Sequence, residues 1–239
     1  DMLNKALRGA ITANVLALGV AFNANAFVVD SNTAIDTEFK IFYQLNSGDT
    51  DPNGNTNVTG QTISGNVVMV LKAFDTTTDL IQFLVTTSNT SAVTGLHVGF
   101  QKLAFGIDPD ATGVTFTDAA DAGFISAQIG ADPEVENAVG GLTLDIQTET
   151  GVGAPRTLNA GETDTFTLDI SFADLTNAGA TFDPFSSKWQ TGAGSYEFPG
   201  TPTDPGPDPD PDPDPMPVPG TLLLLGLGLF GLRWTRRKG

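Results

Sequence analysis

The feature that most constrains the fold is a period-two alternation of apolar and polar residues in the middle of the chain. Residues 166–172 place Phe, Leu, Ile and Phe at every second position, residues 142–147 repeat the pattern, and residues 39–43 follow it more loosely. Such alternation buries one face of a strand and leaves the other in water, as in antiparallel sheets. The sequence therefore predicts half-buried antiparallel strands.

Three further runs are more continuously apolar and predict central strands covered on both faces. These runs are residues 67–74, 80–85 and 96–107. Clusters of Gly, Asn, Asp and Thr separate the runs and predict turns. Many closely spaced strands with glycine-rich turns predict an all-β fold, an antiparallel β-sandwich of jelly-roll type, with a closed barrel as the alternative. The chain has no cysteine, so its core must hold the domain together without disulfides.

The N-terminal end differs from this middle. Two cations precede an apolar stretch over residues 10–22, and an Ala-Asn-Ala cleavage signal follows at 24–26. This order is typical of a secretory signal peptide. We expect a signal helix over residues 1–26 and a mature chain that starts at Phe27. An uncleaved N-terminal helix is the alternative.

Residues 27–200 are expected to form one domain, since that length is sufficient for a real interior. Residues 201–219 are a Pro/Asp-rich linker, in which proline removes hydrogen-bond donors and keeps its neighbours extended. The chain has 28 acidic and 11 basic residues, a net charge of −17. Such an acidic protein repels nucleic-acid phosphates, so no nucleic-acid partner is expected.

The C-terminal end predicts a membrane stop. Residues 220–233 are an apolar Leu/Gly segment that ends in Arg233, and it is shorter than the ~20 apolar residues of a stable span. Residues 234–239 form a basic end, which the positive-inside rule places in the cytoplasm. We expect a short transmembrane helix that suits temporary anchoring, with a permanent anchor as the alternative.

A short proline motif precedes this segment. It consists of Pro217, Val218 and Pro219, and the arginines of the basic end are Arg233, Arg236 and Arg237. The tail resembles the PEP-CTERM sorting signal that exosortases recognise in Gram-negative bacteria, with Val218 at the position of the family's Glu. The resemblance implies an exosortase-like processing enzyme, the export machinery as a partner, and transient anchoring in the inner membrane. It also implies a final location in the cell envelope or on the extracellular surface.

A second resemblance concerns the domain itself. Residues 103–110, 181–185 and 194–198 are similar to domains found beside tails of this type, namely the uncharacterised cistern-type group. This resemblance implies no reaction and adds only support for the expected fold.

The motif with the most specific chemistry is the segment 49–55, which matches the first half of a calcium loop. Its alternating oxygen donors are Asp49, Asp51, Asn53 and Asn55. Gly54 permits the sharp turn that such a loop needs. Gly60 stands where the closing Glu belongs, so a distant carboxylate would have to complete the shell. Calcium is therefore the one cofactor that the sequence indicates, and a polar hairpin loop is the alternative.

Trp189 and Tyr196 flank a glycine-containing turn and are expected to face each other across a hairpin. If the rings are exposed, they form a platform for sugar binding; packing within the hairpin is the alternative. His97 is the only histidine and is expected to be structural. The chain has no nucleophile elbow, phosphate loop or zinc-protease motif.

These observations predict a non-enzymatic, exported protein of the cell surface or extracellular matrix. A carbohydrate-binding module is the first alternative, with extracellular polysaccharide as its partner. A hydrolase that works through two carboxylates is the second alternative.

Overall fold

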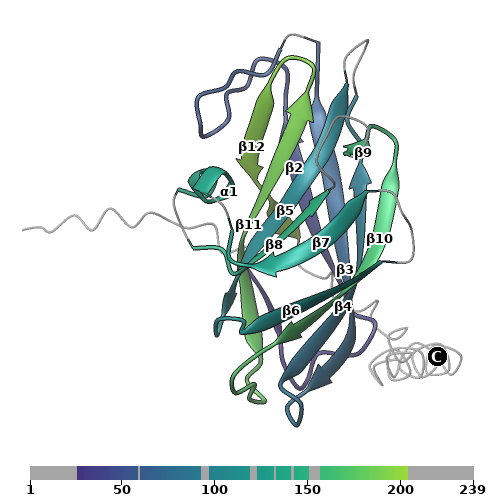
Figure 1. Ribbon diagram of the computed structural model, residues 1–239, viewed down its shortest axis with the longest axis vertical. Coiled ribbons are helices and arrows are strands. Elements are labelled where there is room, and N and C mark those ends of the chain that lie inside the picture. Colours follow the sequence, from purple (N-terminus) through teal and green to yellow (C-terminus); the bar gives the residue numbers. More distant parts are fainter. Residues whose placement is uncertain are drawn as a thin grey trace, which may run out of the picture.

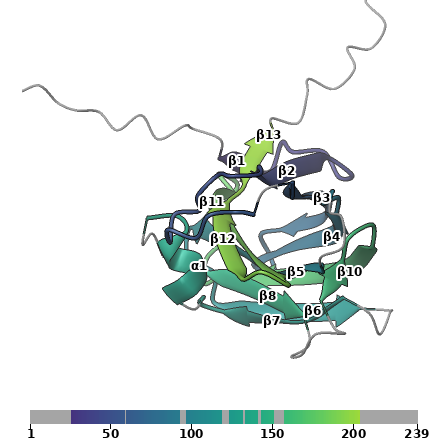
Figure 2. The same ribbon diagram turned by 90° about the horizontal axis from the view of Figure 1, so that it is seen from above.

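The structure is a computed structural model that describes residues 26–203, except 59, 93–96, 119–122, 132, 141–142 and 151–156. The expected signal helix, transmembrane helix and basic tail lie outside the described residues. The described part contains two antiparallel sheets that pack face to face, one of seven strands and one of six (Figure 1, Figure 2). The prediction of an antiparallel β-sandwich is confirmed.

The seven-stranded sheet has the order β1-β11-β5-β8-β7, and two short strands pair beside this path. Its strands are β1 (Phe27–Val29), β11 (Ala180–Thr191), β5 (Val98–Asp108), β8 (Ile146–Thr150), β7 (Phe124–Ile129), β12 (Ser195–Pro199) and β9 (Leu158–Asn159). β12 pairs with β11, and β9 pairs with β5.

The six-stranded sheet has the order β13-β2-β3-β4-β10-β6. Its strands are β13 (Thr201–Thr203), β2 (Glu38–Leu45), β3 (Ile63–Asp75), β4 (Leu80–Asn89), β10 (Thr163–Ser171) and β6 (Gly113–Asp118). The consecutive strands β2, β3 and β4 are neighbours and form a meander. The sequence-distant strand β13 pairs with β2, the first of these three strands. The jelly-roll topology stays a prediction.

The alternation found in the sequence matches the burial of the strands. Residues 39–43 lie in β2 and residues 166–171 in β10, and both strands bury every second side chain. The expectation of two covered faces is wrong for β3 and β4, because both bury one face and leave the other half-exposed. Among the described residues of the pattern at 142–147, Ile146 and Gln147 lie in a strand, β8.

β5 is covered on both faces, as its apolar run predicts. Phe100 and Phe105 point into the main core, whereas Ala104 points outward. Ala104 packs with Val135 of the helix α1 (Pro133–Asn137) and with Leu144, and all three are buried. The segment between β7 and β8 therefore covers the outer face of the seven-stranded sheet.

Aromatic rings fill the space between the sheets. Phe27 of β1 stacks on Phe39 of β2, with ring centroids 4.2 Å apart, and on Phe182 of β11 at 4.9 Å. Phe100 stacks on Trp189 at 4.3 Å, with their planes 12° apart. Large buried rings contribute much of the free energy of such a core. The first strand of the described chain is thus part of the central core.

Candidate functional site

The loop with the half calcium motif lies between β2 and β3 and folds onto the β11–β12 hairpin. Its Asp51 is buried, with 3% of the residue exposed. The Asp51 carboxylate accepts the backbone N–H of Asn55 at 2.7 Å and the backbone N–H of Glu197, on β12, at 3.0 Å. Asp51 therefore closes its own loop and also joins it to a strand far away in the sequence.

Glu197 is the second half of this connection. Its carboxylate accepts a hydrogen bond from the Asn53 side chain and lies 3.5 Å from the Lys188 ammonium. Ser195 also lies within hydrogen-bond distance of it, at 3.4 Å. We refer to Asp51, Asn53, Lys188 and Glu197 as the loop latch. The latch holds the 49–55 loop against the hairpin through charge-assisted hydrogen bonds, which are stronger than neutral ones.

The remaining residues of the motif have local roles. Asp49 accepts the backbone N–H of Asn46 at 3.0 Å and is exposed. The Asn55 side chain donates to Asp51 at 3.2 Å. Among the described residues, no three acidic or histidine side chains are grouped so that they could hold a metal ion.

Glu197 is the distant carboxylate that reaches the loop, as a closed calcium shell would require. Its oxygens, however, contact Asn53, Lys188 and Ser195. The contacts of the loop are those of a hydrogen-bonded hairpin loop, and the interpretation as a calcium loop stays a prediction.

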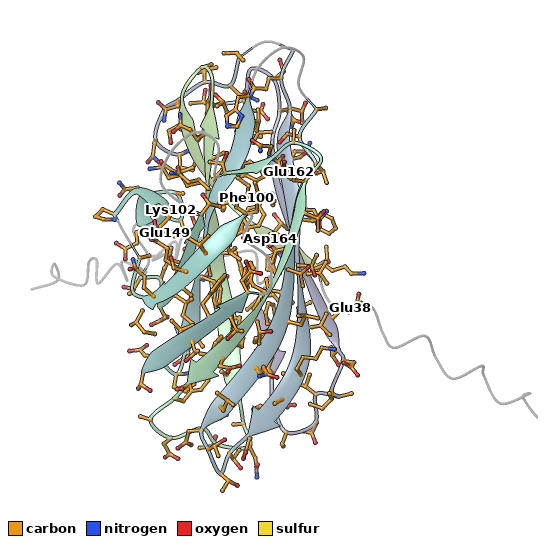
Figure 3. All side chains as sticks on the ribbon, turned by 45° about the vertical axis from the view of Figure 1, so that its right-hand side comes forward. Glu38, Phe100, Lys102, Glu149, Glu162 and Asp164 are labelled. Atoms are coloured by element: carbon orange, nitrogen blue, oxygen red, sulfur yellow. The ribbon has the colours of Figure 1, made fainter. Side chains whose placement is uncertain are left out.

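The latch continues into a row of charges on the outer face of the seven-stranded sheet. Lys188 lies directly opposite Glu197 on one side and opposite Lys102 on the other, and Lys102 lies opposite Glu149. Figure 3 shows Lys102 and Glu149 on neighbouring strands, and their charged groups are 3.6 Å apart. Like charges opposite each other destabilise a sheet. Each lysine therefore has a glutamate on its other neighbouring strand, and this glutamate offsets the repulsion between the two lysines.

Trp189 and Tyr196 are cross-strand partners in the β11–β12 hairpin, as the sequence predicts. Both rings are buried: Trp189 is fully buried and Tyr196 is 3% exposed. The Trp189 indole N–H donates to Ser187 at 2.9 Å, and the Tyr196 hydroxyl lies 3.4 Å from the Thr56 carbonyl. The expectation of an exposed sugar-binding platform does not fit, because both rings are buried in the core and Tyr196 contacts Thr56, directly after the 49–55 loop.

Two carboxyls, the buried Asp164 and the half-buried Asp145, lie next to the ends of strands. Burial raises the pKa of Asp164, although the backbone N–H of Phe124 at 2.7 Å opposes this effect, and Asp118 raises the pKa further. Burial likewise raises the pKa of Asp145, which accepts the N–H of Ile107 at 2.6 Å. Both groups accept hydrogen bonds from a neighbouring strand and therefore serve the fold.

His97 is exposed and lies just before β5, with its Nε2 3.2 Å from the Thr157 hydroxyl. This contact connects the residues that flank β5 and β9. The described surroundings of His97 are those of a structural side chain.

Glu197 and Lys188 are not predicted from the sequence as partners of the 49–55 loop. Both residues occupy ordinary polar positions in a strand, and the sequence separation from Asn53 to Glu197 is 144 residues. No local spacing connects them. Only the position of the hairpin beside the loop reveals the contact.

Comparison with family models concerns the end of the chain. Residues 217–238 match the model described as PEP-CTERM protein-sorting motif. The chain carries a PEP-CTERM sorting signal. This motif marks an exported protein that is sorted to the cell surface, and it implies processing by an exosortase. Comparisons with curated proteins and with solved structures found no match.

The PEP-CTERM residues Pro217, Val218 and Pro219 and the three arginines lie outside the described residues. In the part of the chain that the structure describes, no helix has both the length and the apolar character that a membrane crossing needs. The predicted helix at 220–233 lies outside that part of the chain. The matched motif therefore indicates that the protein is exported and sorted.

Proposed function

We infer that the protein is a non-enzymatic, structural component of the cell surface or extracellular matrix of a Gram-negative bacterium. The PEP-CTERM signal supplies the route, with transient anchoring in the inner membrane and processing by an exosortase. Its proposed partners are the polysaccharide and the other proteins of the cell surface or matrix.

The observation that supports this proposal is the position of the side chains that could bind a ligand or take part in catalysis. Trp189 and Tyr196, the best candidates for sugar binding, are buried in the core. Asp51 and Glu197, the carboxylates of the candidate loop, hold that loop against the hairpin. Residues that a binding module or a hydrolase would present to a ligand instead stabilise the domain.

The route is tested by expressing the full chain in a Gram-negative host that contains an exosortase. A variant that lacks residues 217–238 is the matched control. We expect the full chain in the surface or matrix fraction, with a shortened C-terminus in mass spectrometry, and the control in the soluble exported fraction. Equal distribution of the two chains would contradict sorting through this tail.

The structural role is tested by measuring matrix retention of variants that leave the core intact and of one that disrupts it. Asp49→Ala and Glu149→Gln each remove a carboxylate without opening the core, so retention is expected to stay unchanged. Val135→Asp places a charge in a buried cluster and is expected to abolish retention together with folding. A hydrolase or a single-site binder would instead lose its function through one carboxylate while the domain stays folded.

A further inference from the structure

The two ends of the described domain differ in how closely a predicted processing site approaches the fold. β1 begins at Phe27, the residue directly after the predicted signal-peptidase site. β13 ends at Thr203, whereas the matched sorting motif begins at residue 217. Figure 2 shows β1 and β13 near each other on the same side of the sandwich.

The bond between Ala26 and Phe27 adjoins a cluster of aromatic rings in the core. Phe27 is only 4% exposed and stacks on Phe39, Phe182 and Phe185, with ring centroids 4.2, 4.9 and 5.5 Å apart. Its edge also faces Phe83 at 6.5 Å. Release of Phe27 would therefore expose a whole aromatic cluster.

The backbone of β1 is also held in the sheet. Its three residues pair with β11, with Phe27 opposite Phe182 and Val29 opposite Ala180. Gly179 has a φ of +76°, and a Cβ at this position would lie 1.7 Å from the Val29 carbonyl oxygen. Only glycine permits this approach. Pairing continues beyond the strand, where the Ser31 N–H donates to the Asn177 carbonyl at 3.2 Å.

A peptidase must hold an extended segment on both sides of the bond that it hydrolyses. In the folded domain, the residue after this bond already pairs with β11 and contributes its ring to the core. Cleavage of a folded chain therefore requires β1 to detach first, and its rate follows the population of that open state.

We propose that the folded sandwich protects the Ala26–Phe27 bond, so that signal-peptide removal precedes docking of β1, whereas the sorting tail is processed on the folded domain. Hydrolysis adds one water across the bond and leaves a carboxylate on Ala26 and an amino group on Phe27. The freed strand then docks. Along the sequence, a Pro/Asp-rich segment stands between Thr203 and the matched motif that begins at residue 217. The proposal rests on the predicted cleavage after Ala26 and is independent of any role in the matrix.

The test uses the full chain and a matched variant with Gly-Ser-Gly-Ser inserted between Ala26 and Phe27. The insertion moves the bond away from β1 and leaves the cleavage signal unchanged. Each chain is offered to bacterial signal peptidase twice, first during translation into inner-membrane vesicles and then after purification and folding in detergent micelles. N-terminal sequencing identifies the bond, and gel densitometry gives the rate.

We expect both chains to be cut at similar rates during translation. After folding, we expect the natural chain to be cut at least tenfold more slowly than the spacer variant. Equal rates for the two folded chains would overturn the proposed protection. Failure to cut the natural chain during translation would overturn it too, because Ala26–Phe27 would then not be a processing site.

A second arm examines the C-terminal end. The mature chain and its Phe27→Asp variant, in which a charge opens the core, are incubated with membranes that contain an exosortase. We expect the folded mature chain to be shortened at least as fast as the unfolded variant. Processing of the unfolded variant alone would contradict the proposed order.

Discussion

The outer faces of the two sheets are built in different ways. On the seven-stranded sheet, Ala104 is fully buried under α1, and the side chains of Lys102 and Lys188 are only 13% and 12% exposed. On the six-stranded sheet, outward residues of β4 and β10 form hydroxyl pairs in water, such as Thr86 with Thr165 at 3.2 Å. The α1 segment covers the first face at β5, whereas the second face is open at β4 and β10.

This difference shows where sequence change is tolerated. A covered face needs apolar contacts or paired charges, because an unpaired polar group there loses its hydration. An open face keeps water as an alternative partner, so each of its cross-strand contacts contributes little. Five changes with progressively smaller consequences test this contrast.

The largest effect is expected for Ala104→Asp, which places a carboxylate between Val135 and Leu144. An uncompensated buried charge costs about 3–5 kcal/mol of unfolding free energy. The control Ser88→Asp introduces the same group on the half-exposed face of β4 and should cost less than about 1 kcal/mol. Urea denaturation of both chains gives the comparison. Similar losses in the two variants would show that the face of the seven-stranded sheet is not covered.

The second effect concerns ion pairs. Lys188→Met leaves the Glu197 carboxylate, 8% exposed, without its ammonium partner. We expect a loss of about 3 kcal/mol, because removal of one partner from a buried pair leaves the other charge uncompensated. Lys72→Met breaks an exposed pair with Asp36 and should cost at most about 1 kcal/mol. Thermal and urea unfolding measure both losses, and an equal cost would remove the distinction between the two faces.

The contrast between the faces also indicates what the sequence could predict. Alternation in β2 and β10 identifies the inward residues, because period two follows directly from strand geometry. The pairing of Trp189 with Tyr196 follows from a short turn between them. These predictions succeed because the deciding contacts are close in sequence.

The covered face could not be predicted in the same way. Nothing near Ala104 indicates that Val135 will pack on it, and nothing near Asn53 indicates Glu197. The sequence also treats β3 and β5 alike as apolar runs, although only β5 is covered on both sides. Which of them is covered depends on where a distant segment folds back, and local periodicity holds no information on that.

The third effect tests the loop latch. Asp51→Ala removes the acceptor for the N–H groups of Asn55 and Glu197, and we expect a loss of about 2 kcal/mol. Asp49→Ala removes one exposed acceptor, of the Asn46 N–H, and should cost about 0.5 kcal/mol. Urea denaturation in the presence of a chelator measures both losses.

The same two variants decide the calcium interpretation. If the segment 49–55 is a polar hairpin loop, millimolar calcium leaves the unfolding midpoint of the natural chain unchanged, and titration calorimetry shows no binding. A calcium-dependent gain in stability that disappears in both variants would instead establish the calcium loop, since both carboxylates would then be ligands.

The fourth effect is a pH dependence at Asp164, where the two sheets approach each other. Burial raises the pKa of this carboxyl above its usual value of 3.8, so the folded state holds its proton more strongly than the unfolded state does. The contribution of Asp164 to stability is therefore complete below that value and is lost as the pH rises through the folded pKa. Asp164→Asn should remove this part of the pH profile. Urea midpoints between pH 3 and 7 measure it, and parallel profiles for the two chains would contradict the assignment.

The smallest effect is expected on the open face itself. Thr165→Val keeps the β-branched shape that strands favour and removes one hydroxyl of the pair with Thr86. Water can replace this partner, so the unfolding free energy should change by less than about 0.5 kcal/mol. The comparison change Thr148→Val lies on the inner face of the seven-stranded sheet, where the buried hydroxyl contacts the Leu103 carbonyl at 3.3 Å, and should cost about 1 kcal/mol. A larger loss at Thr165 than at Thr148 would mean that the hydroxyl pairs hold the six-stranded sheet together, and would contradict the small contribution expected of an open face.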